Sequence, residues 1–169
     1  IPELIKKDKT YEVTMRLGQT STTGDKEGEI TVVSDTQPTL EQLQVALAAF
    51  TGDIMQTPPA FSAIKVNGQR AYDLARKGQE VKLEARPAKI YSNELTTYEY
   101  PVVTFTSKVG SGTYIRSLVQ DIGDKLGTGA YMSDLRRTEV GQFDVAEAVQ
   151  LDAVTPEILL GSVKLLTNK

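Results

Sequence analysis

Residues 10–17 alternate between apolar and polar side chains, and this pattern restricts the fold of the chain strongly. The apolar side chains of the segment are Tyr11, Val13, Met15 and Leu17. A period of two residues predicts a β-strand with one buried face. Gly18 ends the pattern, residues 20–28 are rich in turn formers, and residues 29–33 predict a short return strand. The chain therefore requires a sheet with a buried face.

Two segments carry the apolar periodicity of amphipathic helices. Thr39 begins the first, because Gln42 stands three residues later as a capping box requires, and Gly52 is its expected stop. The second helix is predicted over residues 115–126, where apolar side chains fall on one face and Gly127 lies just past the end. A glycine in that place suits the left-handed backbone that often ends a helix.

The remaining elements are shorter. Strands are predicted at 90–100, 102–108 and 139–143, short helices at 71–77 and 131–136, and a last helix within 149–166. The prolines at 58–59 forbid regular pairing, so residues 56–69 are expected to leave the core in extended form. Strands interleaved with few helices, without a regular strand-helix-strand rhythm, predict an α+β fold. We expect a mixed, largely antiparallel sheet with a few flanking helices.

Composition narrows the class of protein. The 169 residues, 40% hydrophobic and 24% charged, fit one globular domain, and no apolar run approaches the roughly 20 residues of a membrane-spanning helix. The chain contains neither cysteine nor histidine, so we expect no disulfide and no metal site. It begins at Ile1 without an initiator methionine or a secretion signal. We therefore expect a fragment of a protein that is not secreted.

Charge is distributed unevenly along the chain. The net charge of −3 argues against a protein that coats nucleic acid nonspecifically, because such binding neutralises many phosphates. Residues 65–89 nevertheless carry seven basic and three acidic side chains. A basic stretch on an acidic body suits a docking surface for one shaped polyanion, and a solvated charged helix fits the same residues equally well.

The densest segment lies at residues 110–118, just before and within the second predicted helix. Gly110 and Gly112 allow the backbone to approach a ligand closely, and the start of a helix favours a negative group. The pattern alone favours an ordinary tight turn between a strand and a helix, with Tyr114 and Arg116 oriented by packing.

Several motifs together resemble the TruB family of tRNA pseudouridine synthases, relatives of dyskerin. They are Ser-Gly-Thr-Tyr-Ile-Arg-Ser-Leu at 111–118, Asp-Ile-Gly at 121–123, Leu-Gly-Thr-Gly-Ala at 126–130 and Leu-Arg-Arg at 135–137. Upstream, residues 11–28 resemble the family's tyrosine-bearing strand and following loop, and residues 56–87 resemble its RNA-gripping insertion. The resemblance covers residues 9–143 and implies a pseudouridine-synthase-like fold, of which residues 1–169 would form a partial catalytic domain.

The resemblance also implies an activity. A uridine in the T-loop of tRNA would be isomerised to pseudouridine without metal or cofactor, by an enzyme that acts in the cytoplasm as a monomer. The base must leave its stack to react, so such an enzyme needs a pocket for an extruded base and a surface that grips the surrounding T-arm.

The resemblance assigns four pocket residues, namely Tyr11, Tyr114, Arg116 and Leu135. Tyr11 would stack on the extruded uracil and relay a proton, whereas Arg116 would pair with the catalytic aspartate through its planar guanidinium. Tyr114 would form a hydrogen-bonding wall of the pocket and Leu135 an apolar wall. An ordinary core tyrosine or leucine would give the same pattern at Tyr11 and Leu135.

The family's catalytic aspartate stands in a Gly-x-Leu-Asp segment, which this sequence does not contain. Asp25, Asp121 and Asp124 occupy other positions of the family pattern, and none of them is assigned as the nucleophile. We therefore expect the isolated chain to be inactive.

Basic side chains are the candidates for contacts with RNA. They are Lys65, Arg70, Arg76, Lys77 and Arg136. The first four lie in the insertion, where positive side chains on an arm can press a folded RNA against the pocket. Adjacent arginines such as Arg136 and Arg137 more often face solvent.

Three interpretations follow. The chain is part of a uridine isomerase, or a non-catalytic module that binds tRNA or helps it to fold, or a β-rich structural domain without an RNA partner. The third interpretation predicts that Arg116 and the charges of residues 65–89 can be changed without consequence.

Overall fold

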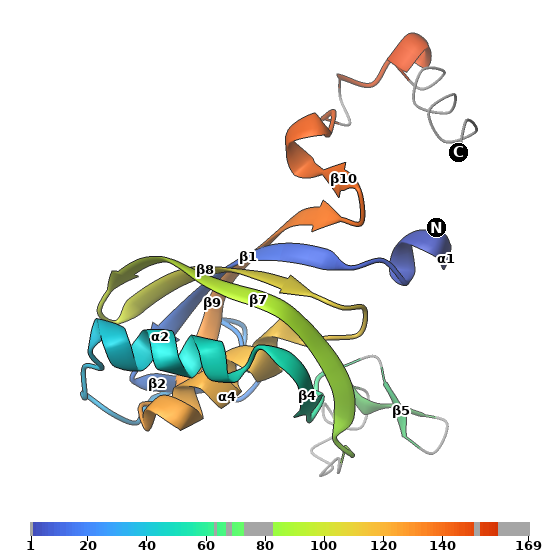
Figure 1. The fold of residues 1–169 in the computed structure, drawn as a ribbon. Coiled ribbons are helices and arrows are strands. Elements are labelled where there is room, and N and C mark those ends of the chain that lie inside the picture. The colour runs from blue at the N-terminus through green and yellow to red at the C-terminus, as the bar shows by residue number, and fades with distance from the viewer. Residues whose placement is uncertain (1, 63, 67–68, 73–82, 151–152, 159–169) are drawn as a thin grey trace.

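A six-stranded antiparallel sheet forms the body of the computed structural model, which describes residues 2–62, 64–66, 69–72, 83–150 and 153–158 (Figure 1). Its strands, in spatial order, are β10 (Phe143–Asp144), β9 (Ala130–Val140), β1 (Lys9–Leu17), β8 (Val102–Val109), β7 (Arg86–Glu99) and β4 (Gly52–Gln56). The expected α+β class and the largely antiparallel sheet are confirmed.

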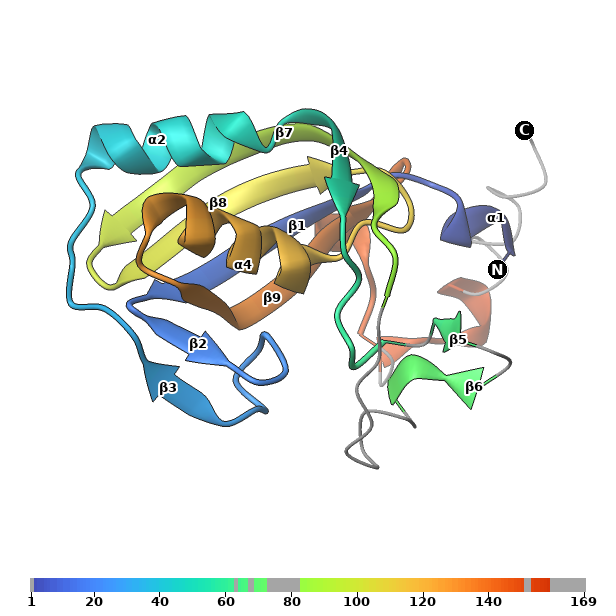
Figure 2. The same cartoon turned by 90° about the horizontal axis from the view of Figure 1, so that it is seen from below.

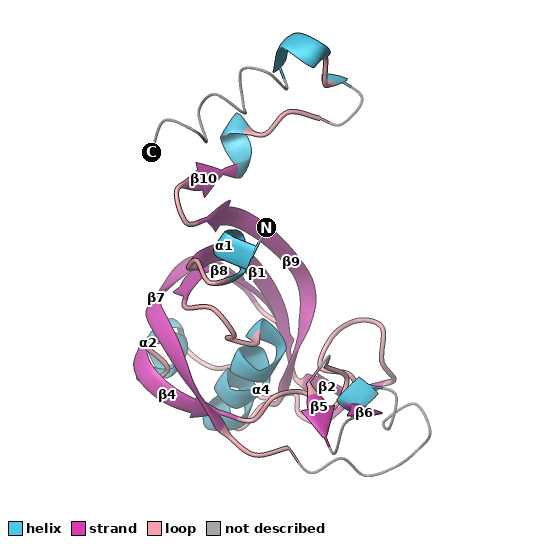
Figure 3. Cartoon of the chain, turned by 90° about the vertical axis from the view of Figure 1, so that its right-hand side faces the viewer, coloured by secondary structure: helices cyan, strands magenta, loops and turns pink. Residues whose placement is uncertain are grey.

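Two helices cover one face of this sheet, α2 (Leu40–Ala49) and α4 (Ile115–Leu126) (Figure 2). Seen from its side, the sheet curves around both helices (Figure 3). The largest fully buried side chains come from both layers and include Val13, Met15, Leu17, Leu43, Leu47, Phe105, Leu118 and Ile122. The apolar side chains between the sheet and the helices therefore form the core.

Strand β1 is central and shows the predicted alternation. Val13 and Met15 are fully buried, and β1 pairs antiparallel with β8 on one side and β9 on the other. Neighbours on both sides satisfy the backbone of β1, so its alternating side chains alone decide which face meets the helices.

Helix α4 matches its predicted bounds. Gly127 ends it in the left-handed conformation, with φ of 71°. Gly123 lies inside the helix, where a Cβ atom would collide with the backbone of Ala130 at the start of β9. The glycine therefore lets α4 lie close against the sheet.

Helix α2 begins with the predicted capping box. The Gln42 N–H donates to Thr39 Oγ1 at 3.2 Å, and the Thr39 N–H donates to Gln42 Oε1 at 2.8 Å. Its end differs from the prediction, because Phe50 is the C-cap and Gly52, with φ of 103°, opens β4. Strand β4 was not predicted, since its five residues show no clear alternation of apolar and polar side chains.

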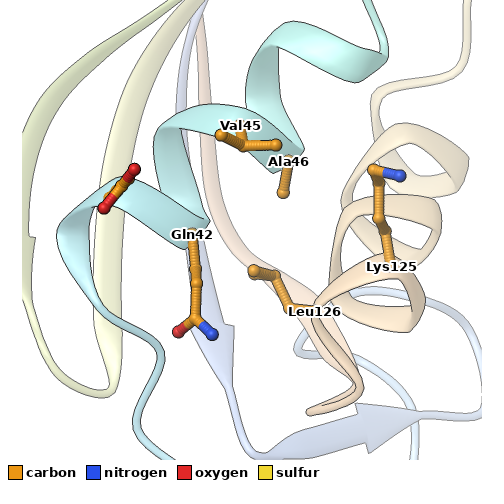
Figure 4. Close-up of a pocket in the computed structure, with 6 residues that line it drawn as sticks. Gln42, Val45, Ala46, Lys125 and Leu126 are labelled. Carbon is orange, nitrogen blue, oxygen red and sulfur yellow. The ribbon is translucent and has the colours of Figure 1, made fainter.

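A groove of about 370 Å³ separates the two helices near the last turn of α4 (Figure 4). It is lined by Glu41, Gln42, Val45, Ala46, Lys125 and Leu126. These residues share no member with the predicted site.

The predicted short helix at 131–136 is wrong, because these residues belong to strand β9. They pair with β1 along their length, with Leu135 opposite Val13 and Tyr131 opposite Arg16. Two register shifts interrupt the alternation of side chains in this ladder, which hides the strand's period of two in the sequence. Tertiary pairing thus overrides the local helical pattern.

The described residues between β4 and β7, namely 57–62, 64–66, 69–72 and 83–85, belong to an arm. It leaves the sheet after Gln56 and returns at Arg86, and these two residues are direct partners in the ladder. Its described part contains a short ribbon of β5 (Lys65–Val66) and β6 (Gln69–Arg70). Of the predicted helix at 71–77, residues 71–72 are helical, and the remainder lies outside the described residues.

The other elements are small. They are α1 (Pro2–Ile5), a hairpin of β2 (Gln19–Ser21) and β3 (Ile30–Val32), and the 3-10 helix η1 (Val145–Glu147). The hairpin confirms the predicted return strand. Within the predicted last helix at 149–166, residues 156–158 form a helical turn, and much of the range lies outside the described residues.

Candidate active site

The start of α4 is held by a side chain from another part of the chain. Tyr114 is the N-cap residue, and its own side chain makes no capping hydrogen bond. Gln56 at the end of β4 takes this place, because its Oε1 accepts from the Tyr114 N–H at 2.8 Å and its Nε2 donates to the Tyr114 carbonyl at 3.0 Å. Two of the predicted site residues, Tyr114 and Arg116, therefore stand on a turn whose position is fixed by β4.

Arg116 binds three oxygen atoms from two segments. Its Nη1 donates to the Thr23 carbonyl at 3.0 Å and to Asp25 Oδ2 at 3.1 Å, and its Nη2 donates to the Phe61 carbonyl at 2.7 Å. The side chains of Arg116 and Asp25 are 21% and 20% exposed, so this ion pair is largely shielded from water. Arg116 is thus not a free surface charge.

Asp25 contacts a predicted site residue and was not itself assigned to the site from the sequence. Its Oδ1 accepts from Thr23 Oγ1 at 2.6 Å and from the Glu27 N–H at 3.1 Å, while its Oδ2 faces Arg116. Both carboxylate oxygens are therefore engaged, which fixes the direction of the carboxylate. The position was recognised as part of the family pattern, but no local pattern links it to an arginine 91 residues away.

The loop that carries Asp25 also contacts β9. The Met132 N–H donates to the Gly24 carbonyl at 3.0 Å, and Asp25 forms an isolated parallel bridge with Met132. Leu135 follows three residues later in β9. The loop thus joins the start of α4 to the strand that carries the predicted apolar wall.

Tyr11 and Leu135 lie on one face of the sheet, in neighbouring strands. Leu135 is the ladder partner of Val13, and Tyr11 stands two residues before Val13 in β1. Because partners in a ladder share a face and side chains alternate along a strand, both point to the face that the helices cover. Tyr11 is partly buried against the core, whereas Leu135 is 37% exposed. An apolar side chain left open beside a tyrosine is what a wall for a flat base requires.

The structure gives less information on the basic residues that were predicted to contact RNA. Arg136 is exposed and pairs with Glu12, so it points to the face away from the helices, and Arg137 is the ladder partner of Tyr11. In the arm, Lys65 and Arg70 are opposite partners on the β5–β6 ribbon. Arg76 and Lys77 lie outside the described residues. Contact of these residues with RNA stays a prediction.

A cavity of about 440 Å³ lies between α4 and the first residues of the arm. Its lining includes Ser117, Asp121 and Asp124 of α4 together with residues 57–60. Burial raises the pKa of Asp121 to about 6, and the neighbouring Asp124 charge adds to the rise. Neither this cavity nor the groove between the helices is lined by Tyr11, Tyr114 or Arg116. That these three residues border one base-sized hollow stays a prediction.

Comparison with known families decides the relationship. Residues 1–115 match the model of the TruB family pseudouridylate synthase N-terminal domain, and residues 116–163 match that of the tRNA pseudouridylate synthase B C-terminal domain. The chain belongs to the TruB family. The suspected resemblance is thereby confirmed, and the border between the two matches falls at Arg116, within the turn described above.

Curated TruB relatives agree with this assignment. The chain is 46% identical to tRNA pseudouridine synthase B of Caulobacter vibrioides over 157 residues, covering 91% of this chain and 50% of the relative. It is 44% identical to the protein of that name from Pseudomonas aeruginosa (strain UCBPP-PA14) over 151 residues, covering 89% and 50%. The chain thus spans about half the length of these curated relatives.

Two solved structures contain chains of similar fold. A chain of a Cbf5-Nop10-Gar1 complex is 26% identical with a TM-score of 0.61, covering 98% of this chain and 39% of that one. A chain of an H/ACA ribonucleoprotein bound to a substrate RNA containing 2′-deoxyuridine is 27% identical with a TM-score of 0.57, covering 85% and 32%. In the part of the TruB chain that the structure describes, no helix is long and apolar enough to cross a membrane.

Proposed function

We propose that the protein carrying this chain isomerises a uridine in the T-loop of tRNA to pseudouridine. The observation that carries the proposal is the family match over residues 1–163, which contains both the tyrosine-bearing strand and the turn with Tyr114 and Arg116. We expect the protein to act on tRNA in the cytoplasm, as a monomer and without a cofactor.

The reaction exchanges one glycosidic bond for another. The bond between C1′ and N1 breaks, a bond between C1′ and C5 forms, C5 loses its hydrogen and N1 gains one. The base must be held flat while it turns, and a phenol ring beside an apolar side chain suits that task. Tyr11 and Leu135 supply this pair on one face of the sheet. Tyr114, on the first turn of α4, would form the polar wall.

Arg116 can hold a second carboxylate in addition to Asp25. A guanidinium carries five N–H donors, and the three hydrogen bonds of Arg116 to the described residues leave two of them without a partner there. A catalytic aspartate supplied by the rest of the protein could accept these donors and stay ionised. Asp25 would then direct the guanidinium, and the second carboxylate would perform the chemistry.

The arm supplies the grip on the RNA. Its ends are neighbours in the sheet at Gln56 and Arg86, and two of its basic residues stand opposite each other on the β5–β6 ribbon. Phosphate contacts made there would set the register of the T-arm while the shape of the loop provides specificity. Replacing one phosphate-binding side chain by alanine should lower the salt dependence of binding by about one charge.

The test follows the hydrogen that leaves C5. A T-loop hairpin labelled with tritium at C5 of its uridines is incubated with a protein of the relatives' length that contains this chain. We expect tritium release from one uridine, loss of release when that uridine is replaced by cytidine, and loss in the Tyr11→Ala variant with most of the binding retained. Absence of release from the native hairpin, or full release by Tyr11→Ala, would contradict the proposal.

A second function is favoured by one observation, namely that the sequence contains no Gly-x-Leu-Asp segment. The chain by itself would then bind and help to fold the T-arm without converting it. Binding of the hairpin by the isolated chain, with no tritium release, is the expected result. Release by the isolated chain would show that another of its carboxylates serves as the nucleophile.

A further inference from the structure

Gln56 is a buried polar side chain at the junction between the sheet and the arm. It is the last residue of β4 and 2% exposed. Among the residues that the structure describes, its amide makes two hydrogen bonds, both to the main chain of Tyr114, 58 residues away. The Tyr114 N–H donates to the amide oxygen of Gln56, and the amide nitrogen of Gln56 donates to the Tyr114 carbonyl. Satisfying both at once requires an uncharged side chain of this length that has a donor and an acceptor at its end.

The same turn of α4 has two further links to the base of the arm. Ser117 Oγ donates to the Thr57 carbonyl at 2.7 Å, and Arg116 Nη2 donates to the Phe61 carbonyl at 2.7 Å. Residues 56–61 therefore run along the first turn of α4 and are bonded to it through three side chains. A shift of the arm's base relative to the sheet would move Tyr114 and Arg116 with it.

We propose that Gln56 is a positioning residue, which sets Tyr114 and Arg116 for the reaction and couples them to the position of the arm. This inference rests on the proposed function. Gln56 itself does not reach the substrate, since its amide is occupied by main-chain groups and shielded from water. Its effect on the reaction passes through the turn that it holds, and a displacement of about 1 Å at such a turn can lower a rate about 10²-fold.

A merely structural glutamine would behave differently. Loss of its two hydrogen bonds would lower the melting temperature, but the molecules that remain folded would react at the normal rate. A positioning residue lowers the single-turnover rate of folded molecules and leaves the affinity for the T-arm largely unchanged. The two roles are separated by measuring rate, affinity and unfolding on the same variants.

The first experiment uses Gln56→Met, which keeps the length of the side chain and removes both polar atoms. Gln44→Met, on the exposed face of α2, is the matched control. Both are made in a protein of the relatives' length and assayed well below the melting temperature. We expect Gln56→Met to release tritium about 10²-fold more slowly with affinity for the hairpin within about threefold, and Gln44→Met to equal wild type. A folded Gln56→Met with a rate within about twofold of wild type overturns the proposal.

If Gln56→Met does not fold, Gln56→Glu takes its place. A neutral carboxyl donates and accepts as the amide does, whereas a carboxylate loses the donor and repels the Tyr114 carbonyl. The rate relative to wild type at the same pH should therefore recover as the pH is lowered. Arg86 opposite Gln56 on β7 and Arg116 on α4 stay charged throughout, and Asp121 on α4 titrates in wild type as well, so the rate relative to wild type reports the introduced carboxyl. A relative rate that is reduced but independent of pH, or not reduced at all, overturns the proposal.

Amide hydrogen exchange gives a readout that does not need the reaction. The Tyr114 N–H should exchange faster in Gln56→Met than in wild type, while amides in the middle of α4 stay protected. Unchanged exchange at Tyr114 would contradict the inference. If wild type releases no tritium, the proposed function fails instead, and the exchange result still decides whether Gln56 holds the turn.

Discussion

The two helices under the sheet begin in different ways. Helix α2 is capped within four residues, by Thr39 and Gln42 bonding to each other's main chain. Helix α4 lacks a side-chain cap of its own, and its first turn is bonded to β4, to the loop around Asp25 and to the arm. The candidate active site lies at the helix start that depends on distant residues. The predicted site residues thus coincide with long-range support, whereas the start of α2 is held within its own segment.

The largest expected effect is a difference in reaction rate between substitutions at the two ends of α4. Arg116→Ala removes the guanidinium that binds Thr23, Asp25 and Phe61, so we expect the single-turnover rate of tritium release to fall about 10³-fold, with hairpin affinity within about threefold. Lys125→Ala, in the last turn of the same helix, should react as wild type does. Equal losses in both variants would remove the distinction between the two ends.

The next largest effect is a difference in rate between variants of two ion pairs that involve the same loop. Asp25 is paired with Arg116 at 3.1 Å and both side chains are shielded, whereas Lys26 and Asp134 are 3.9 Å apart with side chains 65% and 72% exposed. We expect Asp25→Asn to lower the rate about 10²-fold, because the direction of Arg116 relaxes, and Asp134→Asn to change neither rate nor stability measurably. Single-turnover kinetics and denaturant unfolding of the two variants test this. A silent Asp25→Asn would show that the ion pair does not orient Arg116.

A smaller effect is expected at the start of α2. Thr39→Ala removes the N-cap oxygen, which should lower the free energy of unfolding by about 1 kcal/mol and leave the rate within about twofold of wild type. Denaturant unfolding and tritium release measure the two quantities. A rate that falls as far as in the α4 variants would mean that any loosened helix impairs the site.

The smallest expected effect is at Asp121, where the substitution raises the stability of the protein instead of lowering a rate or the stability. Its folded pKa of about 6 lies above its ordinary value, so the folded state binds this proton more tightly than the unfolded state does. The stability that it contributes is therefore greatest below about pH 4 and is lost as the pH rises to about 6. Asp121→Asn should stabilise the protein at about pH 7 by less than about 1 kcal/mol, because water that reaches the half-exposed carboxylate screens its charge, and it should have no effect near about pH 4. The exposed Asp35→Asn variant is the control, and its stability should equal that of wild type at both pH values. Equal stabilisation by Asp121→Asn at both pH values would contradict burial as the cause of the raised pKa.

Local patterns were sufficient for much of the fold. The alternation in β1, the capping box of α2 and the glycine that ends α4 all act within a few residues, and each was predicted correctly. The prediction for the segment that forms β9 failed because its ladder with β1 contains two register shifts and its local pattern resembles a helix. Strand β4 was missed because the pairing with β7 that defines it is not visible in its own sequence.

The residues of the candidate site show the same difference between what local sequence predicts and what long-range contacts determine. Its tyrosines, Arg116 and Leu135 came from a resemblance to a family, not from periodicity or charge. Asp25 bonds to Arg116 and Gln56 to Tyr114, over 91 and 58 residues of sequence, and no local pattern in the sequence connects residues so far apart. The candidate site residues can thus be recognised from motifs, whereas the groups bonded to them required the structure.

The most direct test compares the two helix starts in one assay. Thr39→Ala and Gln56→Met each remove one side chain that holds the start of a helix, and both are measured by single-turnover tritium release from the T-loop hairpin at a temperature where both remain folded. We predict that Gln56→Met reacts about 10²-fold more slowly than wild type and Thr39→Ala within about twofold of it. Equal rates in the two folded variants would contradict the claim that the start of α4, held by distant side chains, is the functional centre of this chain.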